Sequence, residues 1–126
     1  MLRGLNAYGY DIHLEASLQS ESMNVSQVVS RSNMKYLYWS IVQQLTHHTV
    51  TGCNMRTGDL CGTGTISGPT EDSYGSMLEL TWRGEKPIAL SSGETRKFLQ
   101  DGDTVVMKGY CQGDGYRVGF GEVMGK

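Results

Sequence analysis

The sequence predicts a mostly β domain with one packed α-helix, and three observations support this prediction. Glycine is unusually frequent, at 17 of 126 residues, which is about twice its average usage of roughly 7%. These glycines are scattered among β-branched and aromatic residues, as in proteins built from many short strands joined by turns. One early segment alternates apolar and polar residues, and one later segment has helical spacing. A chain of this length is typical of a single domain.

The first strand is predicted over residues 10–18, where apolar and polar side chains alternate. The apolar positions are Ile12, Leu14, Ala16 and Leu18. This period of two is typical of a half-buried strand. His13 falls on the polar face, so we expect a solvated surface histidine. A polar strand or loop is expected to follow over residues 23–30.

One helix is predicted over residues 34–48, with Ser32 or Asn33 as its N-cap. Its apolar residues recur at three- and four-residue spacing: Leu37, Tyr38, Ile41, Val42 and Leu45. His47 and His48 lie in the last turn, where the helix dipole favours a cation, and Gly52 is the expected stop. We expect the stripe of Leu37, Ile41 and Leu45 to pack against the sheet, with Lys35 and Gln43 outside it.

Further strands are predicted after the helix, separated by turns that contain glycine. Their expected ranges are residues 60–66, 76–82, 97–99, 104–111 and 116–120. Asp59 and Asp103 each follow a glycine and are expected to introduce a strand. Residues 112–115, Gln-Gly-Asp-Gly, predict a hairpin turn that needs positive φ angles.

Charge and cysteine content exclude several classes of protein. Eleven Lys+Arg against 13 Asp+Glu give a formal net charge of −2, which argues against a nucleic-acid partner and against a polybasic membrane-surface role. The apolar runs are too short to cross a bilayer, and residues 1–6 lack the apolar stretch of a signal peptide. Three cysteines without a C-x-x-C motif indicate a reducing compartment, so we expect a cytoplasmic protein.

The possible metal ligands do not form a zinc pattern. They are His47, His48, Cys53, Cys61 and Cys111. Their spacing matches no zinc motif, and adjacent histidines on a helix point about 100° apart. Residues 101–103, Asp-Gly-Asp, lack the spacing of an EF-hand and are better explained as a turn. We therefore expect no metal ligand in this chain.

Two segments hold the candidate site residues, and the pattern alone leaves the role of each open. Glu79 is a carboxylate between apolar neighbours, so its burial would need a partner; the alternative is a solvent-facing carboxylate. In residues 61–69, small residues allow a ligand or backbone to approach closely, and Thr63 and Thr65 would present hydroxyls on one side of a strand. The alternative for that segment is a tight sheet crossing.

Six motifs give a more specific indication. They are QQLTHH at 43–48, GCNMRTGDL at 52–60, GTISGP at 64–69, GSMLEL at 75–80, TRKFLQDGD at 95–103 and GYCQGDGYR at 109–117. Together they resemble the C-terminal part of the fumarylacetoacetase (fumarylacetoacetate hydrolase) family. The resemblance covers nearly the whole chain.

That resemblance implies a mixed β-roll, a cytosolic homodimer and hydrolysis of 4-fumarylacetoacetate to fumarate and acetoacetate, the last step of tyrosine and phenylalanine catabolism. In the family, a histidine activates water and a glutamate orients that histidine. A divalent metal, calcium with magnesium nearby, holds the diketone oxygens. Glu79 matches the orienting glutamate, and Thr65 matches a threonine that contacts the substrate.

The resemblance also implies that the chain, residues 1–126, is the C-terminal portion of a catalytic domain and holds only part of its site. The family's catalytic histidine, acidic metal ligands and other substrate contacts lie upstream of the matched region, and none of His13, His47 or His48 takes that histidine's place. We therefore expect the chain alone to be inactive. The alternatives are a non-catalytic structural or dimerisation fragment, and a relative that acts on acylpyruvates or another β-diketone.

Overall fold

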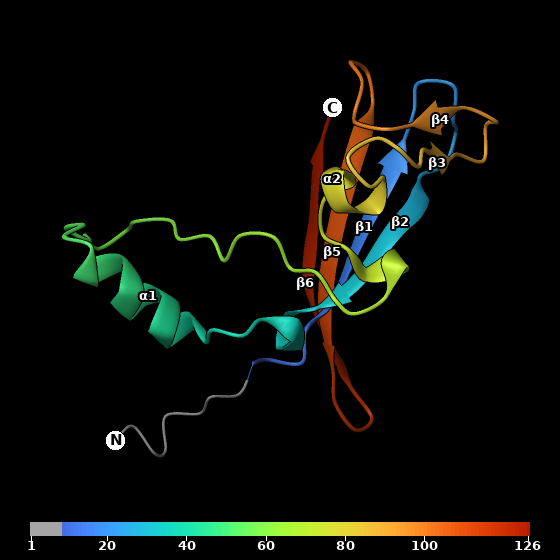
Figure 1. The fold of residues 1–126 in the computed structure, drawn as a ribbon. Helices are drawn as coiled ribbons and strands as arrows, with labels where there is room; N and C mark the ends of the chain where they lie inside the picture. Colours follow the sequence, from blue (N-terminus) through green and yellow to red (C-terminus); the bar gives the residue numbers. More distant parts are fainter. Residues whose placement is uncertain (1–8) are drawn as a thin grey trace.

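The computed structural model describes residues 9–126, so the expectation about residues 1–6 lies outside it. Within these residues, an antiparallel sheet of four strands runs in the order β2-β1-β5-β6 (Figure 1). The strands are β1 (His13–Gln19), β2 (Gln27–Asn33), β5 (Thr104–Gln112) and β6 (Arg117–Gly125). A small second sheet pairs β3 (Ile88–Ala89) with β4 (Thr95–Arg96). The prediction of a mostly β chain is confirmed.

The helical elements of the described residues lie between the strands. They are the 3-10 turns η1 (Met34–Tyr36) and η2 (Glu71–Ser73), and the helices α1 (Ile41–Val50) and α2 (Met77–Leu80). Among residues 9–126 there is no helix with both the length and the apolar character that a membrane crossing requires. Of these elements, η2 contacts β2 directly.

One face of the large sheet carries alternating charges across all four strands. Arg31, Glu15, Lys108 and Glu122 are opposite one another in register. Two ion pairs join them, Arg31 Nε to Glu15 Oε2 at 3.3 Å and Lys108 Nζ to Glu122 Oε2 at 3.2 Å. Opposite charges directly across a strand pair stabilise a sheet modestly. On the same face His13 stacks on Tyr110 with ring centroids 4.8 Å apart.

The opposite face carries a small hydrophobic core at one end of the sheet. Leu18, Met23 and Leu90 are buried there, and Val29 and Val105 pack against them. Leu90 follows β3, so the small sheet covers this end of the large one (Figure 1). The strand predicted over residues 10–18 is present as β1, and Leu18 on its core face is 1% exposed. Burial itself does not alternate along the strand, because Ser17 on the other face is also buried, at 7%.

The helix predicted over residues 34–48 begins later than expected. Asn33 does accept a hydrogen bond from the Lys35 N–H, at 2.9 Å, but it caps only η1. The backbone then extends at Leu37, and α1 begins at Ile41 with Ser40 as its N-cap. Ser40 and Gln43 form a capping box, in which each side chain accepts from the other residue's backbone N–H. The apolar spacing predicts one continuous helix, but the cap at Ser40 starts α1 as an element separate from η1.

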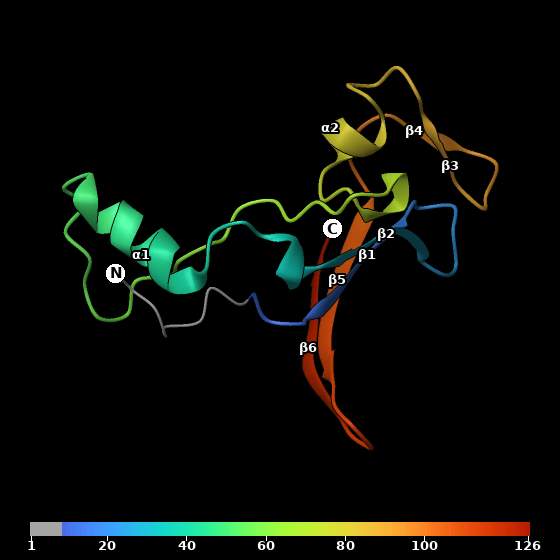
Figure 2. The same ribbon diagram turned by 60° about the horizontal axis from the view of Figure 1, so that its bottom comes forward.

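The predicted packing of this helix on the sheet is also wrong. Helix α1 lies away from the sheet in both views (Figures 1 and 2), and Ile41 and Leu45 remain about half exposed, at 48% and 47%. Their stripe faces the returning segment 53–63 instead. An apolar stripe identifies which face of a helix avoids water, but it does not identify the surface that the face contacts. His47 and His48 do lie in the last turn.

Three of the later predicted strands are wrong, and two are confirmed. Residues 60–66 and 97–99 contain no strand, and residues 76–82 contain α2. Asp59 closes a turn by accepting from the Arg56 N–H at 2.8 Å, and no strand follows it. Strands β5 and β6 are present, and β5 follows Asp103 as expected. The hairpin between them closes through the Gly113 N–H and the Tyr116 carbonyl, with Gly115 at φ +74°.

A buried ion pair joins β4 to the start of β5. Arg96 donates from Nε to Asp103 Oδ2 at 2.9 Å and from Nη2 to Asp103 Oδ1 at 3.0 Å. Their side chains are only 7% and 2% exposed. Asp103 Oδ2 also accepts the Gln100 N–H. The hydrogen bonds from Arg96 hold the pKa of the Asp103 carboxyl below its ordinary value.

Glu94 connects the same region to the loop after β1. Its Oε2 accepts the hydroxyls of Ser20, Ser22 and Ser92, and its Oε1 lies 3.4 Å from Arg96 Nη2. These hydroxyls, Ser20 first, lower the pKa of Glu94 from 4.5 to about 2. Hydrogen bonds to the charged form of a carboxyl favour ionisation, so the loop is held through an ionised glutamate.

Asp103→Asn should destabilise the protein strongly, because it leaves the buried Arg96 charge with only its longer contact to Glu94, at 3.4 Å. Removing one member of a buried ion pair typically costs about 3–5 kcal/mol. Glu122→Gln is the matched control, because it breaks the exposed pair with Lys108 and should cost about 0.2–1 kcal/mol. Urea unfolding measures both losses. Equal losses would contradict the structural importance of the Arg96–Asp103 pair.

Stability should fall as the pH drops from about 4.5 towards about 2, the interval between the ordinary and folded-state pKa values of Glu94. The pKa is lower in the folded state, so the unfolded state binds more protons in this interval and acid favours unfolding. Glu94→Gln should flatten this part of the stability profile, whereas Glu122→Gln should leave it steep. Unfolding midpoints measured across this range test the difference. An unchanged slope in Glu94→Gln would argue against the serine contacts.

Candidate functional site

Two serines of β2 hold the candidate segments against the sheet. Ser32 donates its hydroxyl to the Ile66 carbonyl at 2.9 Å, and Ser30 donates to the Tyr74 carbonyl at 2.7 Å. Two residues apart on one strand, these serines project from the same face. The loop at 64–69 and the segment that leads into α2 are therefore fixed side by side, although they are separate motifs in the sequence.

Glu79 lies in α2, and one of its carboxylate oxygens is held by two hydroxyls. Oε2 accepts from Ser67 Oγ at 2.8 Å and from Ser76 Oγ at 2.9 Å. Within residues 9–126, no hydrogen bond is made to Oε1. The side chain is half-buried, so the free oxygen is available to a further partner.

Thr65 lies in the loop beside the segment that leads into α2. Its Cγ2 is 2.7 Å from the position that a Cβ on Gly75 would occupy, and the Ile66 carbonyl oxygen is equally close. The Gly75 N–H donates to Ser67 Oγ at 3.0 Å. The sequence pattern predicts a strand for each of Thr65 and Glu79, over residues 60–66 and 76–82, but Thr65 is in a loop and Glu79 is in a helical turn. The two segments nevertheless lie together.

The backbone beyond Glu79 is closed by a tight turn. Thr81 is fully buried; its Oγ1 donates to the Met77 carbonyl at 2.7 Å and accepts the Gly84 N–H at 3.0 Å. Trp82 and Arg83 then adopt left-handed backbone angles, with φ of 50° and 59°. Such angles cost about 1–3 kcal/mol each in residues other than glycine. These backbone angles persist because the hydrogen bonds of Thr81 hold the turn in place. The same hydrogen bonds fix the backbone of α2.

The sheet face that carries the docked segments continues as an open apolar groove of about 350 Å³ on β1, β5 and β6. Leu14 is opposite Ser32 on one side and Gly109 on the other, so the groove adjoins the serine contact. Met107 and Phe120 line it and are 52% and 62% exposed. This side of the site offers a mostly apolar wall, in which Lys108 is the charged residue of the lining.

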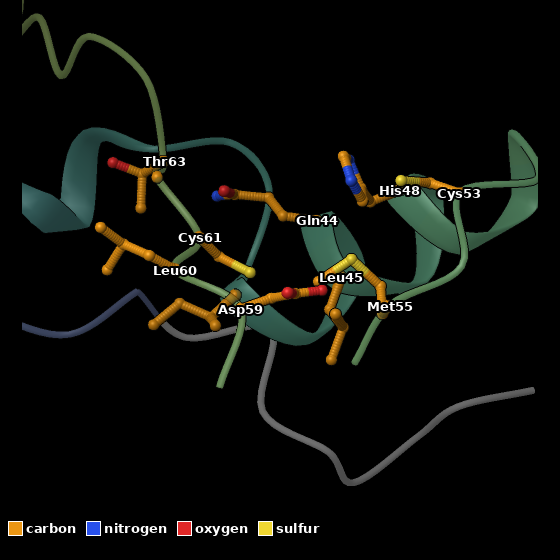
Figure 3. Close-up of a pocket in the computed structure, with 11 residues that line it drawn as sticks. Gln44, Leu45, His48, Cys53, Met55, Asp59, Leu60, Cys61 and Thr63 are labelled. Carbon is orange, nitrogen blue, oxygen red and sulfur yellow. The ribbon is translucent and has the colours of Figure 1, made fainter. Parts of the chain in front are cut away.

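A second cavity of about 470 Å³ lies between α1 and the segment 53–63 (Figure 3). Helix α1 itself lies away from α2 (Figure 1). His48, Cys53, Asp59 and Cys61 line it, and both cysteines are free thiols. Among the described residues, no three His, Cys, Asp or Glu side chains are grouped so that they could hold a metal ion. Thr63 also lines this cavity, so Thr63 and Thr65 do not share a site.

Ser67 and Ser76 belong to the site although sequence reasoning missed them. Ser76 had a usable signal, because Ser-x-x-Glu is the pattern of an N-cap followed by an acidic residue at the third position. Ser76 Oγ does accept the Glu79 N–H at 3.3 Å. Ser67 had no such signal, because its contact with Glu79 spans 12 residues and depends on how the loop docks.

Comparison with known proteins identifies similar sequences over almost the whole chain. The family model described as fumarylacetoacetate (FAA) hydrolase C-terminal matches residues 10–124. The chain is 58% identical over 119 residues to a human protein named fumarylacetoacetase, and 59% identical over 117 residues to one from Arabidopsis thaliana. These matches cover 94% and 93% of this chain. A fumarylacetoacetase from Dictyostelium discoideum is 58% identical over 118 residues. The chain spans 28% of the length of each of these relatives.

Gly75→Ala should displace the loop at 64–69, because the new methyl would lie 2.7 Å from the Ile66 carbonyl oxygen. Overpacking of this kind typically costs about 1–3 kcal/mol. Gly62→Ala is the matched control, since a Cβ there has no neighbour within 4 Å and removing glycine can stabilise by about 0.4–1 kcal/mol. Urea unfolding compares the two. A Gly75→Ala protein as stable as the control would rule out the close approach.

Proposed function

Because the chain belongs to the fumarylacetoacetate hydrolase family, we propose that the whole protein hydrolyses 4-fumarylacetoacetate to fumarate and acetoacetate. Relatives named fumarylacetoacetase, about three and a half times as long as the matched segment, support this proposal. Since the chain spans only part of them, the activity belongs to the whole protein. The observation that carries the proposal is the placement of Glu79, with one oxygen held and one free, beside the loop that contains Thr65.

In the proposed reaction, Glu79 orients a histidine that lies outside this chain. The free Oε1 would accept the N–H of the imidazole, fixing its tautomer, while the negative charge stabilises the imidazolium formed when the other nitrogen takes a proton from water. The hydroxide so formed attacks a carbonyl of the diketone. The carbon–carbon bond then breaks, fumarate is released, and acetoacetate leaves as its enolate and takes up a proton.

Thr65 is proposed to contact the substrate. Its side chain is exposed, and its hydroxyl can donate to or accept from a substrate oxygen. A neutral hydroxyl at the edge of the site would contribute to binding about equally in the ground and transition states. Its removal should therefore affect substrate affinity more than the chemical step.

Calcium and magnesium, a homodimeric assembly and a cytoplasmic location complete the proposal, since the family resemblance implies them. The described residues do not by themselves fit a metal site, because they provide no group of three possible ligands. Exposed apolar side chains on α1 and on the residues just before it support a homodimer in which this surface is covered. Tyr38, Trp39 and Val50 are 89%, 56% and 77% exposed.

Two other functions remain to be tested against this one. A relative that cleaves acylpyruvates or another β-diketone could use the same glutamate, so the substrates must be compared directly. A non-catalytic structural or dimerisation role would leave Glu79 without a chemical task. Turnover of a panel of β-diketones by the whole protein distinguishes the three.

We expect Glu79→Gln to lower kcat by about 10²–10³ with little change in KM, within the usual range for general acid–base catalysis. These variants are measured in a chimera, human fumarylacetoacetase in which residues 10–124 of this chain replace the matching segment of the human protein. Thr65→Val should instead raise KM, by the loss of one hydrogen bond worth about 0.5–1.5 kcal/mol.

Glu71→Gln, a change at an exposed acid in η2, is the control and should leave both constants unchanged. The 126-residue chain alone should show no measurable hydrolysis with calcium or magnesium present. Metal-dependent turnover by the chain alone would contradict the expectation that the catalytic histidine lies elsewhere. An unchanged kcat in Glu79→Gln would leave this residue without the proposed role.

A further inference from the structure

We propose that Ser67 and Ser76 are positioning residues, which together fix the Glu79 carboxylate in the orientation that its histidine partner requires. This inference rests on the proposed function, because it assigns the two serines to the same reaction. The two hydroxyls converge on Oε2, at 2.8 and 2.9 Å, which is within the normal range for O–H···O bonds of about 2.5–3.0 Å. Oε1 is thereby kept for the histidine.

The hydroxyl protons of both serines are directed by backbone contacts. The Gly75 N–H donates to Ser67 Oγ at 3.0 Å, and the Glu79 N–H donates to Ser76 Oγ at 3.3 Å. A serine hydroxyl has one proton to donate and lone pairs that accept. Because each oxygen already accepts a backbone N–H, its own proton is left to donate to the Glu79 carboxylate.

The two serines reach Glu79 from different parts of the chain. Ser76 is the N-cap of α2, three residues before Glu79, whereas Ser67 belongs to the docked loop. The carboxylate torsion of a glutamate is broad and has no strong preference of its own. With Ser76 alone as donor, the carboxylate group could still rotate. Ser67, which donates from a separate segment, restricts this rotation in a way that α2 by itself could not.

The loop that supplies Ser67 is itself fixed to the sheet. Ser32 of β2 donates to the Ile66 carbonyl, one residue before Ser67. Ser30 donates to the Tyr74 carbonyl, in the segment that leads into α2. A chain of hydrogen bonds therefore runs from β2 through the loop to the Glu79 carboxylate. Catalytic groups need such support, because small errors in orientation cost rate.

The test uses the same human chimera, with kcat and KM measured for each variant. Ser67→Ala should lower kcat by about tenfold, the factor that corresponds to 1.36 kcal/mol, and leave KM unchanged. Ser67→Thr retains a hydroxyl and should restore most of the loss. Ser92→Ala is the matched control, because it removes a serine hydroxyl from another glutamate, Glu94, and should leave kcat unchanged.

Ser76 needs a variant that separates its hydroxyl from its role as an N-cap. Ser76→Gly removes the hydroxyl while glycine remains an acceptable cap, at a cost of only a few tenths of a kcal/mol in helix stability. We expect a loss of kcat of about tenfold here too, with only a small decrease in the melting temperature. This second variant keeps the proposal testable if Ser67→Ala fails to fold.

A double-mutant cycle shows whether the serines act through Glu79. In the Glu79→Gln background, Ser67→Ala should lower kcat by no more than about twofold, because the group it positions is already gone. An equal tenfold loss in both backgrounds would assign Ser67 a purely structural role and overturn the proposal.

The outcomes also separate this inference from the proposed function. If Glu79→Gln lowers kcat but Ser67→Ala and Ser76→Gly do not, the positioning role is wrong while the function of Glu79 stands. If Glu79→Gln itself leaves kcat unchanged, the proposed role of Glu79 fails, and the positioning role fails with it.

Discussion

The pairing of β1 with β5 is the constraint on which the rest of this structure depends. It sets His13 opposite Tyr110 and Gln19 opposite Thr104, so two segments from opposite ends of the sequence become neighbours. Of the residues between Gln19 and Thr104, β2 stays in the sheet beside β1, and residues 34–103 must leave the sheet and return to it. The buried Arg96–Asp103 pair lies at the point of return, immediately before β5. Long-range pairing of this kind closes a large loop, whose entropy must be offset by the contacts it allows.

Polar contacts, more than an apolar core, hold the candidate site on this frame. The buried apolar cluster consists of a few side chains at one end of the sheet, whereas the loop and α2 are attached through hydroxyls of β2 and of the site itself. Hydrogen bonds are directional and fix orientation as well as distance. That property suits the role proposed for Glu79, in which one particular carboxylate oxygen faces a histidine.

Helix caps explain where the alternation of side chains misled the interpretation of secondary structure. Residues 76–82 alternate like a strand, yet Ser76 captures the Glu79 N–H and starts α2. In the same way, Ser40 and Gln43 start α1 later than the apolar spacing indicated. Both caps can be recognised in the sequence, Ser76 by the pattern Ser-x-x-Glu and Ser40 by the pattern Ser-x-x-Gln. In a short segment, a cap that satisfies free backbone N–H groups outweighs a weak periodicity.

The sequence by itself determined the features that depend on near neighbours: the alternation of β1, the hairpin between β5 and β6, and the two histidines at the end of α1. Family resemblance in the motifs also singled out Glu79 and Thr65. Only the tertiary structure decided that α1 faces residues 53–63 instead of the sheet, and that Ser67 reaches Glu79. The physical reason is that turns and caps form between residues three or four apart, so both partners of each contact lie close together in the sequence. The docking of the loop depends on Ser30 and Ser32, whose partners lie 44 and 34 residues away, and no local pattern encodes such a contact.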